Sequence, residues 1–389
     1  MRVLHVHSGN LYGGVETMLA TFWRERAACP ALETRFALCF EGRLSEELRA
    51  AGACVYALGG VRVRSPLSVR RARHTLAHLL REREFDVAVC HSSWSQALFG
   101  SVARAAGVPL VFWMHAPAGG RHWLERWARR TTPDLVVCNS NFTAESARNL
   151  YANARAEVVH CPVSLKAARL SNAERAALRA ELDTNESATV VVQVGRMESL
   201  KGHALHLEAL SLLKDTPGWV CWQVGGAQRL HEATYLERLK GLASQLGIAD
   251  RVRFTGERSD VPSLMAAADV YCQPNVRPES FGITFVEALA ARLPAVTTDI
   301  GGAREIINDS CGLLVPHSDA RALASALRRL IENPSAREEL GARGPARAKQ
   351  LCDPSAQLNR LQGLFDALAC SMPRPSSDNL LLIDRRLHG

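Results

Sequence analysis

Residues 277–307 read RPESFGITFVEALAARLPAVTTDIGGAREII, and this stretch shows the order of elements that decides the fold. A helix-like run leads into a short apolar strand, PAVTTD, and a turn at two glycines follows the strand. Two carboxylates, Glu279 and Glu287, lie eight positions apart, the first where a loop enters the helix and the second two turns further in. At 3.6 residues per turn they fall on neighbouring faces, so they could address two parts of one ligand.

The same alternation of strand and helix runs along most of the chain. Short apolar runs rich in β-branched residues recur without strict alternation, which is typical of strands buried on both faces of a parallel sheet. The first series is RVLHVHS, FDVAVCHS, PLVFWMHA, PDLVVCNS and AEVVHCPV, and the second is ATVVVQVG, WVCWQVGG, RVRFTG, ADVYCQP, PAVTTD and CGLLVP. The sequence therefore predicts an α/β fold with two doubly wound, Rossmann-like domains.

The boundary between these domains is predicted near residue 165. The segment that follows has a capping box at Ser171 and Glu174 and ends in the polar turn DTNES. We therefore expect one domain at 1–165 and a second at 166–352. Residues 353–389 form a last segment with a helix, a turn at PRPSSDN and an apolar LLLID in the tail.

The composition indicates a cytoplasmic protein with a sizeable core. Hydrophobic residues make up 47% of the 389 positions. No apolar run reaches the roughly eighteen residues of a spanning helix, and the start MRVLHVHSGN does not resemble a secretion signal. The eleven cysteines are scattered without a CxxC pair, which favours buried reduced thiols over disulfides or zinc, and we expect no metal site.

The net charge of +8 is concentrated in the N-terminal half, because residues 1–169 carry +9 and residues 170–389 carry −1. Such asymmetry indicates an anionic partner: a phospholipid surface, a lipid-linked phosphate or nucleic acid. Much of the excess lies at 65–84, where apolar residues form a stripe opposite the arginines (Val69, Ala72, Leu76 and Leu79). A solvated helix face and a membrane-surface helix both fit this pattern.

A second basic stretch, RHWLERWARR at 121–130, places Trp123, Leu124 and Trp127 on one face among arginines. Core packing is the favoured interpretation, although tryptophan beside arginine also suits a membrane interface. A nucleic-acid binder would need neither a carboxylate pair nor phosphate-binding loops, so we expect no nucleic-acid partner.

In a doubly wound sheet ligands bind beyond the carboxyl ends of the strands, and between two such domains a shared cleft is the natural place. Gly13 and Gly14 follow the first strand and open a predicted helix, where backbone amides can approach an anion. Arg196 and Lys201 follow the first strand of the second domain, where two cations can hold a diphosphate. Tight turns explain most glycine pairs, and surface cations many such arginine–lysine pairs, when each is taken alone.

His115 stands at the carboxyl end of a predicted parallel strand, where histidine is more often polar lining than catalytic. Gly301 and Gly302 stand at another strand-to-helix turn. Neither feature specifies a reaction by itself.

Together these residues resemble the retaining glycosyltransferases of family 4, which have the two-domain GT-B fold. The resemblance covers most of the chain: GGVE at 13–16, GR and KG within 195–202, PESFG with its second glutamate at 278–287, and GG followed by Glu305. The pair Glu279 and Glu287, framed by Pro278, Phe281 and Gly282, is the most specific of these signals. The family's fold implies that the two domains face a central cleft, with the acceptor on the N-terminal side and the nucleotide sugar on the C-terminal side.

The resemblance also implies roles for the carboxylates. Glu287 would accept hydrogen bonds from the ribose hydroxyls of a nucleotide donor, and Glu279 would orient the hydroxyls of the donor sugar. Amides around Phe281, Gly282 and Ile283 would bind the diphosphate at the helix start.

On the same basis, Arg196 and Lys201 would neutralise the charge that grows on the departing nucleoside diphosphate, in place of a metal. Gly13 and Gly14 would bring the N-terminal domain close to the reacting centre, and His115 would contact the donor sugar. No cofactor is expected. The donor is expected to be a nucleotide-diphosphate sugar and is open among UDP, GDP and ADP sugars, with UDP and GDP sugars as the leading candidates.

The acceptor is not legible in the sequence, although the basic half favours a lipid-linked or anionic one and peripheral contact with the cytoplasmic membrane. The expected role is synthesis of a surface polysaccharide, glycolipid or glycosylated metabolite. Arg304 departs from the family pattern, in which proline is common, and Arg277 stands where many relatives have other residues. The last helix of GT-B enzymes commonly crosses back to the N-terminal domain, which is the expectation for 353–389.

Two other enzyme classes are alternatives for a chain with paired carboxylates and this fold. A glycoside hydrolase would place both carboxylates at the scissile bond, whereas the resemblance assigns only Glu279 to the sugar. A nucleotide-sugar epimerase of GT-B fold would convert its donor without an acceptor. No residue is assigned as general base.

Overall fold

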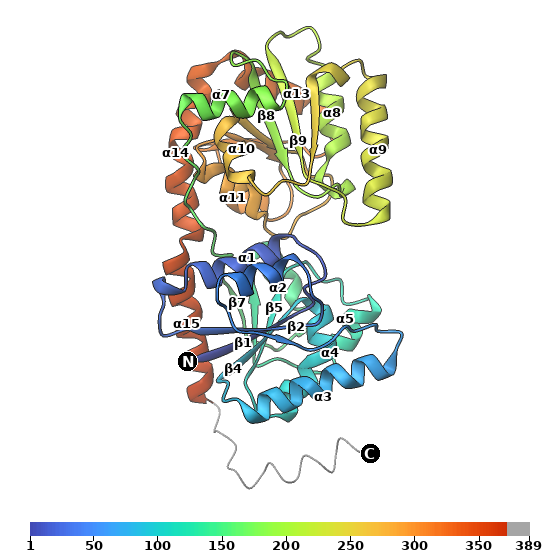
Figure 1. Cartoon of the computed structure of the whole chain (residues 1–389), viewed down its shortest axis with the longest axis vertical. Coiled ribbons are helices and arrows are strands. Elements are labelled where there is room, and N and C mark those ends of the chain that lie inside the picture. Colours follow the sequence, from blue (N-terminus) through green and yellow to red (C-terminus); the bar gives the residue numbers. More distant parts are fainter. Residues whose placement is uncertain (372–389) are drawn as a thin grey trace. The chain divides into compact units, whose positions relative to one another are not determined.

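The computed structural model describes residues 1–371, in which the chain forms two compact units (Figure 1). Val163–Asp353 forms one unit, and Met1–Pro162 forms the other together with the helix that begins at Pro354. Each unit contains one parallel sheet with helices, so the predicted class of two Rossmann-like α/β domains is confirmed. The LLLID segment of the tail lies outside the described residues.

The first unit has a seven-stranded sheet in the order β3-β2-β1-β4-β5-β6-β7, and every pairing is parallel. The order reverses between β1 and β4, which is the switch point at which doubly wound sheets bind ligands. The strands are β1 (Arg2–His7), β2 (Glu33–Leu38), β3 (Val55–Ala57), β4 (Val87–His91), β5 (Leu110–Met114), β6 (Leu135–Cys138) and β7 (Ala156–Val158).

The helices of this unit follow its strands, as the parallel connections require. They are α1 (Gly14–Arg24), η1 (Arg26–Ala28), α2 (Arg43–Ala50), α3 (Pro66–Glu82), α4 (Ser92–Ala105), α5 (Trp123–Ala128), α6 (Asn141–Ala147) and α15 (Pro354–Ser371). The last helix, α15, packs against α1 and η1, so the end of the described chain is part of the first unit.

The second unit has a six-stranded sheet in the order β10-β9-β8-β11-β12-β13, again with parallel pairings. Here the order reverses between β8 and β11. The strands are β8 (Thr189–Val194), β9 (Trp219–Val224), β10 (Val252–Gly256), β11 (Val270–Gln273), β12 (Ala295–Thr298) and β13 (Gly312–Val315).

Around this sheet α8 packs with α9 and α13, while α11 packs on α14 and α7 on α10 (Figure 1). The helices are α7 (Asn172–Glu181), η2 (Ser199–Lys201), α8 (His203–Ser211), α9 (Leu230–Gln245), η3 (Ala249–Arg251), α10 (Val261–Ala267), α11 (Ile283–Ala290), α12 (Ala303–Ile306), α13 (Ala320–Glu332) and α14 (Pro334–Cys352). The capping box at Ser171 and Glu174 is present at the start of α7.

Two strands of the first sheet, β2 and β3, are not among those predicted from the sequence. The run ETRFAL of β2 begins with three polar residues, and β3 has three residues at the edge of the sheet. Each strand of the two predicted series is present. The helix predicted at 65–84 is α3, with Ser65 at the N-cap position, and its stripe is buried at Ala72, Leu76 and Leu79.

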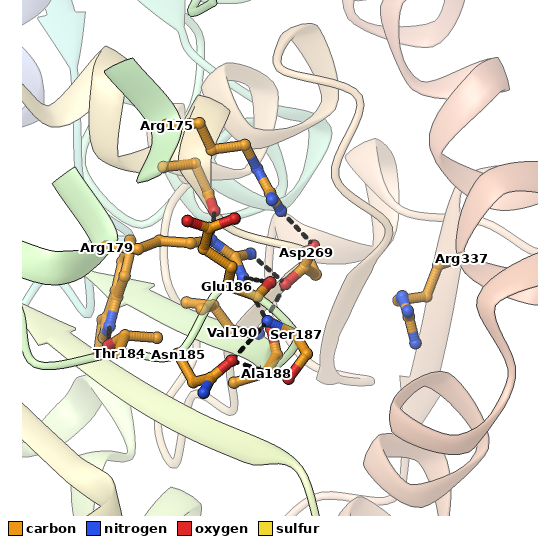
Figure 2. Close-up of polar contacts among 12 residues, drawn as sticks. Arg175, Arg179, Thr184, Asn185, Glu186, Ser187, Ala188, Val190, Asp269 and Arg337 are labelled. Carbon is orange, nitrogen blue, oxygen red and sulfur yellow. Dashed lines mark hydrogen bonds and ion pairs between the residues drawn. The ribbon is translucent and has the colours of Figure 1, made fainter. Parts of the chain in front are cut away.

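A buried arginine ties α7 to the second sheet (Figure 2). The guanidinium of Arg179 donates from Nη1 to the carbonyls of Glu186 and Ala188, and from Nη2 to Asp269 Oδ2 at 2.7 Å. The same carboxylate oxygen accepts the amide of Val190 at 2.7 Å. Asp269 therefore joins the guanidinium of α7 to the start of β8, one of the two central strands of this unit.

The cysteines carry free thiols, and all except Cys54 and Cys370 are buried. In the described part of the chain, no helix has the length and apolar character needed to cross a membrane.

Candidate active site

The carboxylate of Glu279 is the centre of a polar cluster at the carboxyl edge of the second sheet. Its Oε1 forms an ion pair with Nζ of Lys201, and its Oε2 accepts from the side-chain amides of Gln273 (2.8 Å) and Asn275 (3.2 Å). Both amides are fully buried, whereas Glu279 and Lys201 keep 16% and 14% of their side chains exposed. The buried amides therefore fix the position of the Glu279 carboxylate, while part of the Glu279 and Lys201 side chains remains exposed to solvent.

Neighbouring strand residues hold the two amides in place. The hydroxyl of Thr297 donates to the backbone carbonyl of Gln273 at 2.7 Å, and that of Thr298 donates to the carbonyl of Asn275 at 2.6 Å. Both threonines lie at the end of β12, next to β11 in the sheet. The threonines at the end of β12 therefore fix the backbone that carries the two amides bound to Glu279.

The loop that carries Glu279 packs directly on the glycine pair after β12. The amide of Gly302 donates to the carbonyl of Glu279 at 2.9 Å. A Cβ at Gly301, whose φ is +64°, would lie 2.6 Å from that same oxygen, and a Cβ at Gly302 would lie 2.3 Å from the carbonyl of Ser280. No side chain fits at either position, so the two glycines allow the PESFG loop to pack directly against the backbone of this turn.

Lys201 reaches Glu279 because the loops after β8 and β11 interlock. The amide of Val276 donates to the carbonyl of Leu200 at 2.9 Å. Gly202, with φ +72°, packs so closely that a Cβ there would lie 1.7 Å from the carbonyl of Pro274. Backbone packing between the loops that follow two adjacent strands therefore places Lys201 beside the carboxylate of Glu279.

Arg196 lies in the same loop but contacts other carboxylates. Its guanidinium pairs with Glu198 and with Glu232, the latter at 3.3 Å from Nη1. Glu232 is fully buried at the start of α9, and its other oxygen accepts the amide of Gln228 at 2.7 Å. The structure thus brings Lys201 to Glu279 and holds Arg196 through a separate pair of acids.

A buried polar layer supports the backbone of both cations. Gln193 donates to the carbonyl of Lys201 at 2.8 Å, and Nε2 of His203 lies 3.2 Å from the carbonyl of Arg196. Gln193 also contacts His206, with 2.9 Å between Oε1 and Nδ1. Burial lowers the pKa of His206 to about 3, and it also lowers the pKa of His203. The layer is therefore neutral at physiological pH.

The start of α11 lies directly after Glu279 in the chain. Gly282 caps the helix with φ +104°, and a Cβ there would lie 2.5 Å from the ring of Phe285. The side chains of Phe281 and Ile283 are buried, so only their backbone amides are suited to an anion. Since α11 begins at Ile283, Glu279 lies in the loop and helical spacing does not relate it to Glu287.

Tyr271 is a fully buried residue of β11 whose ionisation is affected by both glutamates. Burial raises its pKa well above the usual value, and the charges of Glu279 and Glu287 raise it further. Both carboxylates therefore act on one buried hydroxyl, which donates to Gln273 Oε1 at 3.0 Å. Glu287 itself lies on α11 and is half-buried.

In the first unit, the glycine pair lies at the N-terminus of α1. The amide of Gly13 donates to Glu16 Oε2 at 2.9 Å, and the other oxygen of Glu16 lies 2.6 Å from Nε2 of His7. The amide of Gly13 therefore already donates a hydrogen bond to the capping carboxylate of Glu16. Gly14, the first residue of the helix, is exposed.

His115 follows β5 directly and belongs to a stack of aromatic rings. Its Nε2 lies 2.9 Å from Nδ1 of His91, and its ring stacks on Trp113 with centroids 5.7 Å apart. Burial lowers the pKa of His115 to about 3, so this ring is neutral at physiological pH. In the described part of the chain, no group of three or more histidine, cysteine, aspartate or glutamate side chains is arranged so that it could hold a metal ion.

Several residues of the site were missed from sequence. Gln273, Asn275, Gln193 and Glu232 carry the hydrogen bonds described above, yet none belongs to a recognisable motif. The available signal is a polar residue at the carboxyl end of an otherwise apolar strand, as in VYCQPN and VVVQVG. For a buried strand in a doubly wound sheet, that is where ligand-facing groups stand.

Family comparisons cover both units. The family described as Glycosyltransferase Family 4 matches residues 12–167, and the family described as Glycosyl transferases group 1 matches residues 174–347. The structure of Anabaena HepE in complex with UDP-glucose superposes with a TM-score of 0.82 over 94% of this chain and 100% of that chain, at 23% identity. This last similarity supports the fold.

Three curated relatives are also similar. A D-inositol 3-phosphate glycosyltransferase of Kineococcus radiotolerans is 30% identical over 69% of this chain and 68% of its own length. One of Nocardioides sp. is 32% identical over 66% of this chain, and the match spans 62% of that relative, less than two thirds. The lipopolysaccharide core biosynthesis glycosyltransferase LpsD of Rhizobium meliloti is 28% identical over 94% of this chain and 98% of its own length. Together with the two-sheet architecture, these matches show that the chain belongs to the group 1, family 4 glycosyltransferases and has the GT-B fold.

Proposed function

We propose that this chain transfers a sugar from a nucleoside-diphosphate sugar to an acceptor with retention of anomeric configuration and without a metal. The observation that carries the proposal is the pairing of Glu279 with Lys201 beside the start of α11. A carboxylate accepts hydrogen bonds from sugar hydroxyls, while an ammonium and helix-terminal amides stabilise a diphosphate. A donor that carries a sugar and a diphosphate would therefore contact the carboxylate, the ammonium and the helix-terminal amides of this cluster.

In the proposed reaction the bond between the anomeric carbon and the diphosphate oxygen breaks. The negative charge that develops on the leaving group is stabilised by Lys201, by Arg196 and by the amides at Gly282 and Ile283. The acceptor hydroxyl attacks from the face that the leaving group departs, and a phosphate oxygen takes its proton. Glu287 binds the ribose, and His115 contacts the donor sugar.

The donor is proposed to be a UDP or a GDP sugar, and the HepE complex with UDP-glucose supports the first. The test is incubation with UDP-glucose, UDP-galactose or GDP-mannose in EDTA, followed by proton NMR. We expect slow release of nucleoside diphosphate from one donor, and the first sugar formed should keep the configuration of that donor. An inverted sugar, or conversion to another nucleotide sugar without release of diphosphate, would contradict the proposal.

For the acceptor we propose a lipid-linked molecule at an anionic membrane surface. Helices α3 and α5 both pack against α4, and the guanidinium of Arg73 lies 5.7 Å above the ring of Trp127. The expectation of core packing is wrong for Trp123, which is 49% exposed on α5, and Leu67 at the start of α3 is 67% exposed. Exposed apolar side chains among arginines suit the headgroup region of a bilayer.

Vesicle sedimentation tests this association. The protein should bind phosphatidylglycerol vesicles more strongly than phosphatidylcholine vesicles, and less at high salt, because surface charge drives the contact. Reversal of the exposed Arg70 and Arg71 to glutamate should weaken binding. The matched control reverses Arg328 and Arg329, an exposed pair on α13 of the second unit. Equal loss in both double variants would argue against a surface formed by α3.

A further inference from the structure

Three histidines form a continuous hydrogen-bonded chain across the switch point of the first sheet. Nδ1 of His5 lies 2.9 Å from Nε2 of His91, and Nδ1 of His91 lies 2.9 Å from Nε2 of His115. The three residues stand in or directly after β1, β4 and β5, which are neighbours in the sheet. The chain therefore runs from the core of the unit to its carboxyl edge.

The two ends of the chain have different surroundings. His5 is 1% exposed and stacks between Phe22 and Phe36, with ring centroids at 5.1 and 5.7 Å. Its Nε2 is buried and has no hydrogen-bond partner among the described residues. At the other end His115 is only partly buried. The middle ring, His91, is fully buried.

All three rings are neutral near pH 7. Burial lowers the pKa of His5 and of His115 to about 3, and it lowers the pKa of His91 well below its usual range. A neutral imidazole donates at one nitrogen and accepts at the other. In a chain of three such rings the choice is shared, because each donor must face an acceptor.

Only two arrangements satisfy both hydrogen bonds. If His115 donated from Nε2, the sequence would end at a protonated Nε2 of His5, an N–H buried between two phenylalanine rings. If His115 is protonated on Nδ1, the inner end is instead an unshared electron pair. Buried N–H groups without an acceptor are rarer in native proteins than unfilled acceptors, which favours the second arrangement.

We propose that His5 and His91 are positioning residues that hold His115 in the tautomer with its proton on Nδ1, so that His115 donates a hydrogen bond to its ligand and cannot serve as a general base. Under the proposed function, on which this last step rests, the acceptor is an oxygen of the donor sugar. The ligand chemistry is therefore a hydroxyl or ether oxygen with a free electron pair.

The test is a long-range proton–nitrogen correlation spectrum of the whole protein labelled with 15N-histidine, in which protonated and bare ring nitrogens have distinct shifts. His115 is assigned with His115→Asn. In the wild-type protein its Nδ1 should be protonated and its Nε2 bare. In His91→Phe the constraint on Nε2 is gone, and the protonated-Nε2 tautomer should gain population. The control Phe36→Leu disturbs the packing around His5 but keeps every nitrogen, so it should leave the tautomer unchanged.

Kinetics give a second readout. In His91→Phe, kcat/KM for the nucleotide sugar should fall about 3- to 10-fold, the loss of one neutral hydrogen bond, while binding of the free nucleoside diphosphate stays unchanged. The proposal would be overturned if the proton of His115 lay on Nε2 in the wild-type protein, or if it stayed on Nδ1 to the same extent in His91→Phe. If His91→Phe does not fold, the wild-type spectrum alone decides. If no nucleotide sugar is turned over, the proposed function fails while the tautomer is still determined by the spectrum.

Discussion

Lys201 and Glu279 form an ion pair at the carboxyl edge of the second sheet, although 78 positions separate them in the chain. The contact depends on two backbone approaches, Gly202 against Pro274 and Gly302 against the carbonyl of Glu279. Each strand end supplies one charge, and the adjacency of β8 and β11 joins them. Opposite charges held this way leave one side of each group available to a ligand that carries hydroxyls and phosphates.

Replacement of Lys201 by methionine should lower kcat by about 100- to 1,000-fold, the typical cost of losing one group that stabilises transition-state charge. Lys201→Arg should recover part of the activity, since the charge remains but its compact geometry is lost. Steady-state kinetics measure both variants. The control is Lys214→Met, an exposed lysine of the same unit. Equal kcat values for Lys201→Met and the control would remove Lys201 from the mechanism.

The two glutamates should separate binding from turnover. Glu287→Ala should weaken the binding of free nucleoside diphosphate by about 10-fold or more, because hydrogen bonds to a charged group contribute about 1.5–3 kcal/mol. Glu279→Gln should lower kcat while the affinity for the free nucleotide stays within about twofold, since this carboxylate is assigned to the sugar. Calorimetry and initial rates measure the two effects. Normal binding and turnover in both variants would refute the assignment.

Gly202→Ala should destabilise the second unit more than Gly247→Ala does. Both glycines have a positive φ, +72° and +70°, so both substitutions carry the left-handed strain of about 1–2 kcal/mol. Only at Gly202 would the new Cβ meet the carbonyl of Pro274, whereas no atom lies within 4 Å at Gly247. Urea unfolding of the two variants measures the difference. Equal losses would mean that the contact with Pro274 relaxes without cost.

The sequence is informative about the site wherever a residue type is tied to a backbone requirement. The sequence predicts a turn at Gly301 and Gly302, and the structure shows in addition that the backbone of the Glu279 loop packs against both glycines. Apolar strands such as VVVQV are legible because burial on both faces removes the alternation. Lys201 and Glu279 are each legible as candidates at the end of a strand.

The direct contact between Lys201 and Glu279 cannot be predicted from the sequence, because it depends on which strands are neighbours in the sheet. Arg196 shows the same limit. Its position near Lys201 in the sequence predicts a shared site, yet its guanidinium pairs with Glu232, which comes from the start of α9. The chain of His5, His91 and His115 joins three strands and has no local pattern at all. Periodicity determines elements, whereas these contacts arise from sheet order.

Stability should fall as the pH is lowered from 7.5 to 5.5, before most carboxylates titrate. His5 and His206 have pKa values lowered to about 3 in the folded chain, while an unfolded histidine titrates near 6.5. Below about pH 6.5 the unfolded state therefore binds more protons, and each such histidine removes about 1.4 kcal/mol of unfolding free energy per pH unit. Urea titrations at several pH values measure this slope. A flat profile over this range would show that these rings are not held neutral.

The central claim, a nucleotide-sugar site in the second unit, is tested most directly by thermal unfolding with UDP, GDP, ADP, TDP or CMP, each in EDTA and in magnesium. A ligand at a hundred times its dissociation constant adds about 2.7 kcal/mol, enough to raise the midpoint by several degrees. We predict that one nucleoside diphosphate stabilises the protein equally in EDTA and in magnesium, and that Glu287→Ala loses the effect. Stabilisation that requires magnesium, or no stabilisation by any of the five nucleotides, would contradict the account.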